Sequence, residues 1–354
     1  MVDRELITTL RAELRRHGYF ERRTARILLE LVLHASVAIG GMWLALATTS
    51  WWLRAGGVFM SGVGSLAVGT NTHSASHNAA ARRRWVNDLL TYFGYPFFVG
   101  LSAMYWWHKH VAVHHPAPNV VGIDDDSDLA PWFALTNEEA ARGGRWRRFY
   151  YRRLQGFLFP VVLGVTGFRM QMFGWPHILR TIRAGGPRAR KAWIDVGALT
   201  GHYLFWLGLP MLWFSPWMVL LLYAARVILI GYGMFAVLAP GHFPLDAAAV
   251  QRDHHKGDFV LLQTASTVNF DVGFVGRFLC SGLEYQIEHH LFPDISHPHY
   301  PRVARYVQEF CRKRGYPYRS YSWTRAVFES LRVLYMPKPV RYELNALRTT
   351  PAAE

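Results

Sequence analysis

The sequence predicts an all-α integral membrane protein, with four transmembrane helices in two hairpins, interfacial helices and a cytoplasmic cap. Three observations predict this fold. Hydrophobic residues make up 51% of the 354 residues and gather in long stretches, tryptophans stand where paired stretches turn, and arginines cluster at the other ends. We find no tandem repeat, low-complexity tract or shift in composition, so one membrane domain is expected.

Four apolar stretches approach the ~20 residues that a bilayer-spanning helix needs. Trp51 and Trp52 stand in the turn of the first hairpin, and Trp213 and Trp217 flank the turn of the second. Because tryptophan concentrates at membrane interfaces, we expect both turns at one membrane surface. The expected spans are residues 31–48, 55–69, 193–214 and 217–239.

Two further apolar stretches, 89–107 and 157–174, contain Gly, Pro or Arg169 and are flanked by basic residues. We expect them to lie in or dip into the cytoplasmic interface, and a transmembrane position is the alternative. The acidic run from Asp124 to Asp128 is expected to be a solvated loop or the start of a helix.

Positive charge predicts the orientation. The chain has 39 Lys and Arg against 24 Asp and Glu, which gives a formal net charge of +15. Basic clusters precede the first span, follow the second and precede the third, so both termini and the cap are expected in the cytoplasm, at the plasma membrane or a bacterial inner membrane. The expected parts are a cytoplasmic amphipathic segment (1–30), the membrane domain (31–320) and a cytoplasmic tail (321–354). The arginine-rich face could bind an anionic partner, or it could serve only the positive-inside rule, and we expect no nucleic-acid partner.

The candidate chemistry lies in the histidines, of which there are 17, because two cysteines without a CxxC motif make no disulfide scaffold or zinc site. Clusters follow the apolar stretches, and on a helix histidines at i and i+4 can reach one metal ion. Eight imidazoles exceed the coordination of a single ion, so two ions are expected. Imidazole suits Zn, Cu, Fe and Ni alike, but HExxH and Glu-x-x-His motifs are missing from the sequence. The clustered residues are His73, His77, His110, His114, His115, His289 and His290, with His242 alone after the last span.

Several longer motifs resemble the membrane fatty acid desaturase family, in particular its front-end and acyl-lipid branch. The strongest is Tyr285-Gln-Ile-Glu-His-His-Leu-Phe-Pro293, which looks like that family's third histidine box. The segments 82–90, 106–120 and 263–269 resemble the surroundings of the first, second and third boxes. The resemblance runs from about residue 15 to residue 320, and the chain carries no HPGG motif of a fused cytochrome b5 domain.

The resemblance implies a di-iron centre in the cap. It implies ligation by His73, His77, His114, His115, His289 and His290, and His242 matches the family's isolated ligand histidine. The second box usually reads HxxHH, whereas here Val111 holds the outer position and His110 lies one residue earlier. Gln286 stands where many relatives carry histidine, and its amide oxygen could bind iron weakly. We include His110 and Gln286 in the expected ligand set.

The resemblance further implies oxygen-dependent desaturation of an acyl chain, with two Fe ions as cofactor and O2 as co-substrate. Two electrons per turnover must come from outside the chain, and we expect a separate ferredoxin or cytochrome b5 as the donor. The acyl chain could be carried as an acyl lipid, an acyl-CoA or on acyl-carrier protein.

Residues beside the boxes are assigned two further roles. Asp88, Glu284 and Glu288 are expected to orient the imidazole rings, with a surface charge or helix cap as the alternative for each. Aromatic residues beside the boxes are expected to line an acyl channel, with ordinary packing as the alternative. These residues are Trp106, Trp107, Phe270, Phe274 and Tyr285.

Other functions remain open at this point. A hydroxylase or acetylenase would use the same machinery. A membrane metal transporter or a non-catalytic lipid-binding protein is the alternative from a different class, although a transporter would place its histidines within the spans rather than after them. Iron content and oxygen consumption by the reduced protein distinguish the enzyme from the non-catalytic protein.

Overall fold

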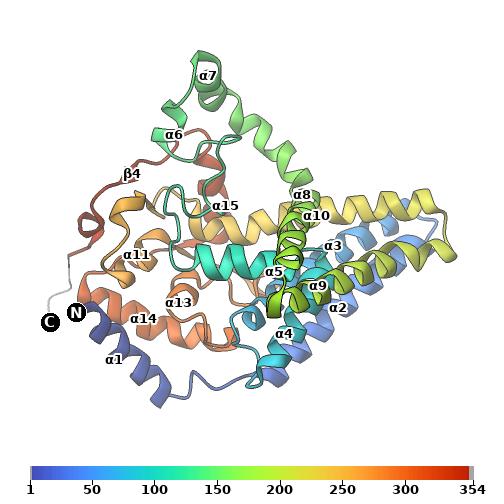
Figure 1. Ribbon diagram of the computed structural model, residues 1–354, viewed down its shortest axis with the longest axis horizontal. Coiled ribbons are helices and arrows are strands. Elements are labelled where there is room, and N and C mark those ends of the chain that lie inside the picture. Colours follow the sequence, from blue (N-terminus) through green and yellow to red (C-terminus); the bar gives the residue numbers. More distant parts are fainter. Residues whose placement is uncertain (1, 351–354) are drawn as a thin grey trace.

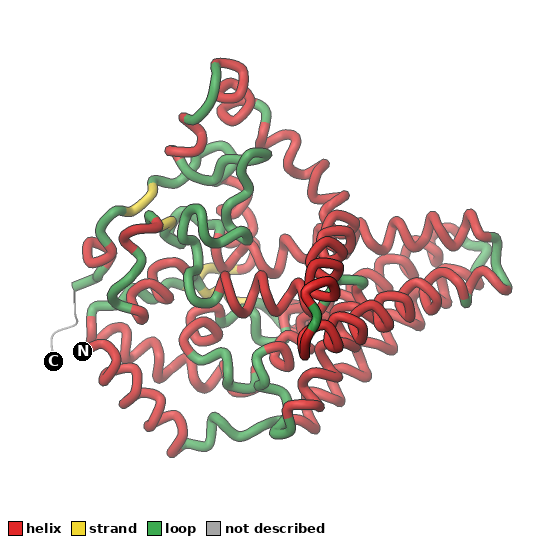
Figure 2. The backbone as a smooth tube through the Cα atoms, viewed as in Figure 1, coloured by secondary structure: helices red, strands yellow, loops and turns green. Residues whose placement is uncertain are grey.

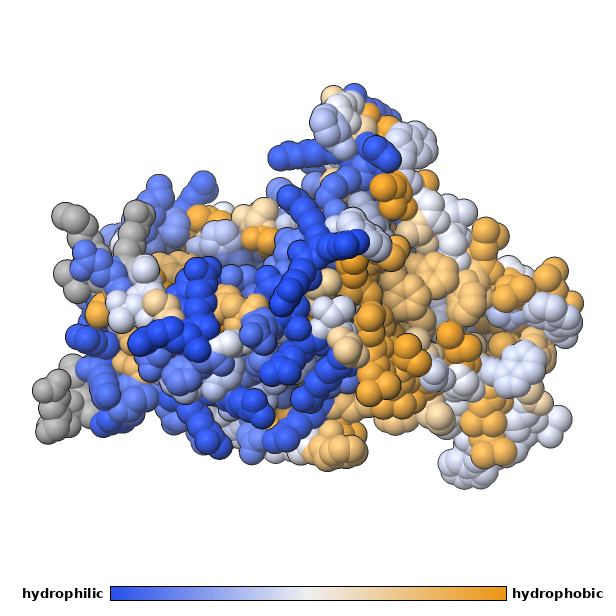
Figure 3. Space-filling view, turned by 90° about the horizontal axis from the view of Figure 1, so that it is seen from below, coloured by the Kyte–Doolittle hydropathy of each residue, from blue (hydrophilic) through white to orange (hydrophobic). Residues whose placement is uncertain are grey.

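The computed structural model describes residues 2–350, which are predominantly helical (Figures 1 and 2). A helical arm projects from a broader cap, and Figure 3 shows hydrophobic residues gathered over the arm and hydrophilic ones over the cap. This division is the one expected of a protein with its arm in the bilayer and its cap in water.

The arm contains two helical hairpins. In the first, α2 (Thr24–Ala47) packs closely on α3 (Trp51–Ser76). Glycine at position 57 allows this approach, since a Cβ there would lie 2.5 Å from the carbonyl oxygen of Gly41. In the second, α9 (Gly186–Tyr203) continues through the π-helical η3 (Leu204–Gly208) and the 3₁₀ turn η4 (Pro210–Leu212) to α10 (Pro216–His242). Both hairpin turns lie at the same end of the arm (Figure 1).

Three helices are long and apolar enough to cross a membrane by length and composition: α2, α8 (Gln155–Ala184) and α10. Helices α3 and α9 fall short of that criterion, because α3 turns polar from Thr70 onward and α9 begins with Arg188, Arg190 and Lys191. The stretch 157–174, which we expected at the interface, lies within the 30-residue α8. Figure 1 shows α8 crossing the direction of the arm helices rather than running alongside them.

A buried cation stabilises the inside of the arm. The guanidinium of Arg226 on α10 donates hydrogen bonds to Ser65 Oγ at 2.9 Å and to the carbonyl oxygen of Phe98 at 2.7 Å. It also lies 3.8 Å from the ring centroid of Trp206. These contacts join α10 to α3 and to the segment 93–99.

The stretch 89–107 forms no continuous helix. It is divided among α4 (Arg84–Tyr92), the π-helical η1 (Phe93–Val99) and α5 (Ala103–Trp106), and a second π-helix, η2 (Trp107–His114), follows. Pro96 lies inside η1, and Gly100 after it adopts a φ of 84°, which favours glycine. The break turns the chain so that η2 enters the cap.

The cap packs α1 (Val2–Arg16), α11 (Phe259–Ser266), α13 (Gln286–Leu291) and α14 (Tyr300–Arg314) around one hydrophobic core. Two small parallel sheets depart from the expected all-α fold: β1 (Ala249–Val250) with β4 (Val340–Arg341), and β2 (Asn269–Asp271) with β3 (Ser320–Ser322). The remaining helices are α6 (Asn137–Ala141), α7 (Arg145–Arg153), α12 (Phe274–Cys280), α15 (Trp323–Arg332), and the 3₁₀ turns η5 (Arg252–His254), η6 (His297–His299) and η7 (Leu344–Leu347).

The C-terminal residues are packed onto the rest of the chain. Trp323 at the start of α15 donates a hydrogen bond to the carbonyl oxygen of Ala236 on α10 at 2.8 Å, and β4 pairs with β1. The described part of the segment 321–354, which we expected to be a cytoplasmic tail, therefore packs on α10 and on β1. Residues 351–354 of that segment lie outside the described residues.

Candidate metal centre

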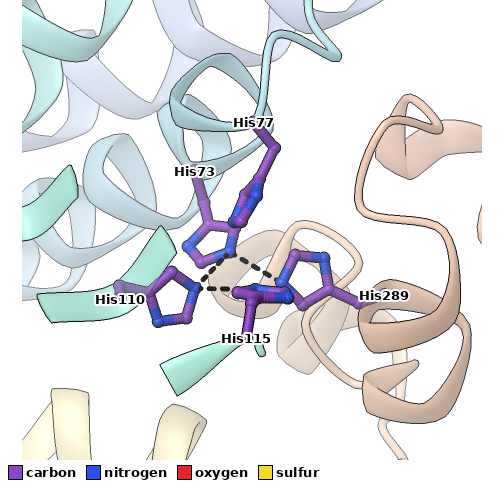
Figure 4. A group of neighbouring side chains, drawn as sticks. All are labelled: His73, His77, His110, His115 and His289. Atoms are coloured by element: carbon purple, nitrogen blue, oxygen red, sulfur yellow. Dashed lines mark hydrogen bonds between the residues drawn. The ribbon is translucent and has the colours of Figure 1, made fainter. Parts of the chain in front are cut away.

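Five buried imidazole rings converge at the junction of arm and cap (Figure 4). One nitrogen of each ring lies within 4.8 Å of the corresponding nitrogen of the others. The Nε2 atom of His73 lies 3.0 Å from that of His289 and 3.2 Å from that of His110, which in turn lies 3.1 Å from His115 Nε2. We call this set the five-histidine group: His73, His77, His110, His115 and His289.

A second buried set, the three-histidine group, consists of His114, His242 and His290. Gln286 joins it, because its amide oxygen lies 3.2 Å from His242 Nε2. Gly241 makes room for this side chain, since a Cβ at that position would lie 2.4 Å from Gln286 Cγ. The two groups together bring all nine expected ligands into one region.

The spacing of the nitrogens fits bound metal ions. Ligand nitrogens about 2.1 Å from an ion and 90° apart are separated by about 3.0 Å, which agrees with the observed Nε2 separations of 3.0–3.2 Å. In addition, His77 Nε2 and His290 Nε2 are buried without any hydrogen-bond partner in the described part of the chain. Buried polar atoms are rarely left unpaired, so these nitrogens are available for a metal ion in each group.

The π-helix η2 decides how His110, His114 and the following His115 divide between the two groups. The sequence prediction paired His110 with His114, at the α-helical spacing of i and i+4. In the structure the amide of His115 instead donates to the carbonyl of His110, the i to i+5 bond of a π-helix, at 3.0 Å. His110 and His115 therefore share the five-histidine group, and His114 belongs to the other. The prediction of a pair at i and i+4 holds only for His73 and His77, which share one group at the end of α3.

Adjacent histidines belong to different groups. His289 and His290 are consecutive on α13, and consecutive side chains of a helix point in different directions. His114 and His115 divide in the same way. Each of these pairs therefore links the two groups through a single peptide unit.

Burial keeps most of the imidazoles in the cap neutral, as metal ligation requires. It lowers the pKa of His110, His115, His289 and His290 well below the usual value, and the neighbouring histidines lower it further. Neutral rings have an unprotonated nitrogen that can bind a cation.

Residues that the sequence analysis did not identify contact the Nδ1 atoms of the rings. The Tyr95 hydroxyl lies 3.2 Å from His73 Nδ1, the Tyr300 hydroxyl 3.2 Å from His289 Nδ1, and Gln263 Oε1 3.0 Å from His290 Nδ1. Such contacts fix the orientation of a ring and leave its Nε2 directed at the metal position. Of the three, Gln263 begins the segment 263–269 that resembles the family, but that resemblance did not assign it this role.

Asp124 is the carboxylate that contacts a candidate ligand most closely. Its Oδ2 lies 2.9 Å from His114 Nδ1, and its side chain is fully buried. Burial disfavours the charged forms of both side chains. The attraction and hydrogen bond between the two groups outweigh this effect, so the pKa of Asp124 is lowered and that of His114 is raised. The expectation of a solvated acidic loop is therefore wrong for Asp124, which the fold turns inward to accept hydrogen bonds from the amides of Asn119 and Asp126 as well.

Two of the three expected orienting carboxylates, Glu288 and Asp88, contact groups other than the rings. Glu288 is buried and accepts hydrogen bonds from Asn269 Nδ2 and the Tyr318 hydroxyl, each at 2.8 Å, so it anchors α13 rather than a ring. Burial raises the pKa of Glu288, and likewise that of the buried Glu284, to about 7. Asp88 lies on α4 and pairs with Lys191 Nζ at 3.0 Å, which joins α4 to α9.

A largely apolar cavity of about 1240 Å³, here called the main cavity, reaches both histidine groups. Its walls come from α8 (Phe159 to Phe173), α10 (Gly231 to His242) and η2. A smaller inner chamber of about 420 Å³ continues from it between α3, η1 and α10. Both spaces are lined by His73, Trp106, Met234, Leu238 and Leu283. The candidate metal positions therefore lie beside a largely apolar space.

Of the five aromatic residues expected to line a channel, only Trp106 lines this space. It stacks on His110 with ring centroids 4.3 Å apart. Trp107 packs against Tyr92, and Phe270 lies in a separate hydrophobic cluster with Leu66. The remaining two, Phe274 and Tyr285, line a different surface groove, and Phe274 is 91% exposed.

Lys338, which lies in the C-terminal segment, fixes the position of the end of α10. This buried ammonium donates hydrogen bonds to the carbonyl oxygens of His242 at 2.8 Å and Ala247 at 2.6 Å. Asn119 Nδ2 donates to the same His242 carbonyl at 2.8 Å. Burial lowers the pKa of Lys338 to about 7. Sequence analysis missed Lys338 because it lies beyond the last recognisable motif.

Replacing Lys338 with methionine is expected to weaken metal binding in the three-histidine group by about 10- to 100-fold, the usual effect of losing a residue that orients a ligand. The variant leaves a buried carbonyl without one of its donors and frees the backbone that carries His242. Metal content by mass spectrometry, across a chelator titration, measures the effect. The control is Lys313→Met, an exposed lysine that pairs with Glu309 and with no other carboxylate in the described part of the chain. Equal metal retention in both variants would contradict the prediction.

Comparisons with known proteins bear on this region of the chain. The chain is 28% identical over 283 residues to the Delta(5) fatty acid desaturase fat-4 of Caenorhabditis elegans. This alignment covers 73% of the chain and 58% of that protein. It is 28% identical over 275 residues to the chloroplastic acyl-lipid (7-3)-desaturase of Chlamydomonas reinhardtii, covering 73% and 51%, respectively. It is 27% identical over 272 residues to the sn-1 linoleoyl-lipid 6-desaturase of Synechocystis, covering 73% and 72%. The chain thus spans little more than half the length of the first two relatives.

The sequence profile described as "Fatty acid desaturase" matches residues 49–322. This range contains every histidine of the five-histidine and three-histidine groups. Because the match extends over most of its length, the chain belongs to the fatty acid desaturase family.

Proposed function

We propose that the protein is an oxygen-dependent fatty acyl desaturase that holds two iron ions, one in each histidine group. One observation carries the proposal: eight buried imidazoles from segments more than two hundred positions apart meet beside a largely apolar space lined by α8, α10 and η2. Imidazole-rich sites suit iron, and family membership favours iron over zinc or copper.

The reaction removes two hydrogens from adjacent carbons of the acyl chain and reduces O2 to two molecules of water. Two of the four electrons come from the acyl chain, and two come from an external ferredoxin or cytochrome b5. When bound, the iron ions would supply the oxygen chemistry that unactivated C–H bonds require.

The residues of the chain hold and orient the reactants. The imidazoles would bind the ions through Nε2, and Asp124, Tyr95, Tyr300 and Gln263 keep four of the rings in place through Nδ1. The main cavity and inner chamber would take the extended acyl chain and exclude water from the carbons beside the histidines. The acyl chain would arrive on a lipid, on coenzyme A or on acyl-carrier protein.

We further propose four spans, made by α2, α3, α9 with η3, and α10, with α8 lying in the cytoplasmic interface. The direction of α8 across the arm and the exposed tryptophans at the two turns support this arrangement, as Trp52 is 70% and Trp217 82% exposed. Both termini and the metal centre would then face the cytoplasm. Cysteine-accessibility labelling at the hairpin turns and at α7 tests this topology.

Mass spectrometry of acyl lipids and acyl thioesters tests the function. Cells that express the chain should contain acyl species lighter by two mass units, and cells that express His289→Ala should not. A gain of sixteen mass units instead would identify a hydroxylase. Purified protein without iron, or iron-loaded protein that consumes no oxygen when chemically reduced, would contradict the proposal.

The inner chamber is expected to set the longest acyl chain that is accepted. Met234 lines both spaces, so Met234→Trp should narrow the passage between them. Turnover of the longest accepted chain should fall about tenfold, which corresponds to ~1.4 kcal/mol, while shorter chains are less affected. Met234→Leu, of similar volume, is the control, and product chain-length profiles are the measurement. An unchanged profile in Met234→Trp protein with full iron content would contradict the assignment.

A further inference from the structure

A second concave surface lies beside the metal centre, between the start of α2, α12 and the start of α14. It has a volume of about 1620 Å³. Among the described residues, its lining shares no member with the main cavity or the inner chamber. We call it the arginine groove, after the cations that line it: Arg23, Arg26, Arg277 and Arg302.

The exposed charge of the arginine groove is positive. Within the described chain, no salt bridge or hydrogen bond engages the guanidinium groups of Arg277 and Arg302, which are both exposed. The two carboxylates in the lining offset little of this charge at the surface. Glu30 is paired with Arg26 and His297, and Glu284 is buried. Such a surface complements an acidic partner.

A first hydrogen-bonded route leads from this groove to the five-histidine group. His297 lines the groove, and its Nδ1 lies 2.9 Å from the hydroxyl of Ser74. Ser74 is the covalent neighbour of His73, whose Nε2 lies among the converging nitrogens. A single side-chain contact therefore separates a groove residue from the backbone of a candidate ligand.

A second route passes through Tyr300. Its hydroxyl lies 3.2 Å from His289 Nδ1, and the residues on either side of it in the sequence, His299 and Pro301, line the groove. Two candidate ligands of the same group are thus connected to one surface groove by different chains of contacts. This connection is what an electron needs in order to travel from the surface to a buried metal ion.

We propose that the arginine groove is the docking site of the electron donor, a soluble one-electron carrier protein with an acidic face. This inference rests on the proposed function, which requires two electrons from outside in each turnover. The carrier would dock twice per turnover, and each time it would lose one electron to the metal centre. The charge of the groove would steer the carrier, and the contacts through His297 and Tyr300 would bring its redox centre close to the ligands.

Neither an acyl carrier nor a lipid headgroup fits these observations as well. An acyl carrier would have to sit where its acyl chain can enter the main cavity, and the groove has no lining residue in common with that cavity. A binding site for a lipid headgroup would use the arginines, but it would give no role to the two routes of contacts that lead to the candidate ligands.

Charge reversal with the double variant Arg277→Glu, Arg302→Glu tests the proposal. The probes are an acidic [2Fe–2S] ferredoxin and a soluble cytochrome b5 domain, each measured against the purified full chain at low ionic strength. We expect affinity for the accepted carrier, and the bimolecular rate at which it reduces the metal centre, to fall at least tenfold. Reduction by dithionite with a small viologen mediator should stay unchanged.

The matched control is Arg148→Glu, an exposed arginine on α7, which Figure 1 places at the far end of the cap from α14. It should change the affinity less than twofold. The docking site is overturned if the double variant binds and accepts electrons as wild type does, if wild type binds neither carrier, or if only its binding to anionic phospholipid vesicles falls. Failure of chemically reduced wild type to consume oxygen would instead contradict the proposed function, and the affinities would still decide the docking site.

Discussion

Replacing His110 with alanine is expected to abolish desaturation. The ring occupies one corner of the five-histidine group, with its Nε2 3.2 Å from that of His73 and 3.1 Å from that of His115. A metal ion contributes several kcal/mol to such a reaction, so loss of a ligand should lower turnover by about 10³-fold. Iron content should fall from two ions per chain toward one. Product analysis by mass spectrometry and iron analysis of the purified protein measure the two effects.

His108→Ala is the matched control, because it removes the same side chain two positions earlier. The ring of His108 is exposed and stacks on His177 with centroids 5.0 Å apart, outside both histidine groups. The control should keep both iron ions and full turnover. If His110→Ala protein also kept both, His110 would not be a ligand, and the departure of the second box from HxxHH would need another explanation.

Replacing Asp124 with alanine is expected to weaken iron binding in the three-histidine group by about 10- to 100-fold, with a similar loss of turnover. The variant releases His114 Nδ1 from a partner 2.9 Å away and leaves the amides of Asn119 and Asp126 without their acceptor. Asp124→Asn, which keeps an acceptor but loses the charge, should lie between alanine and wild type. Iron retention during dialysis against a chelator is the measurement.

Asp128→Ala provides the control within the same acidic run. Its carboxylate accepts hydrogen bonds from the amides of Gly122 and Ala130, each at 3.2 Å, and contacts no histidine. Similar iron loss in the Asp124 and Asp128 variants would mean that the loop as a whole, and not the contact with His114, supports the site.

The sequence predicted that these histidines meet, because the pattern of positive charge placed all the clusters on one expected side of the bilayer. All eight imidazoles and Gln286 lie together in the structure. Their division between two groups could not be predicted, since it depends on a π-helix at 107–114 that no residue in the segment announces. The α-helical spacing rule holds at His73 and His77 and fails at His110 and His114 for this reason.

Residues that support the ligands were harder to find than the ligands. Asp124 looks like any member of a solvated acidic run, and only the fold of the loop turns it inward. Lys338 reaches His242 across ninety-six positions, from a segment without a motif. The membrane position of α8 was hard to predict. This helix is long and apolar enough to span a bilayer, but it runs across the arm helices rather than parallel to them.

The two adjacent histidine pairs have a consequence for how the protein matures. Since His114 and His115, like His289 and His290, serve different groups, an ion that immobilises one ring also fixes the backbone of its neighbour. Occupancy of the first position thus pre-organises the second and lowers the entropic cost of filling it. Iron binding should therefore be cooperative. Cells short of iron should accumulate metal-free chains and chains with both ions bound, with few chains that hold a single ion.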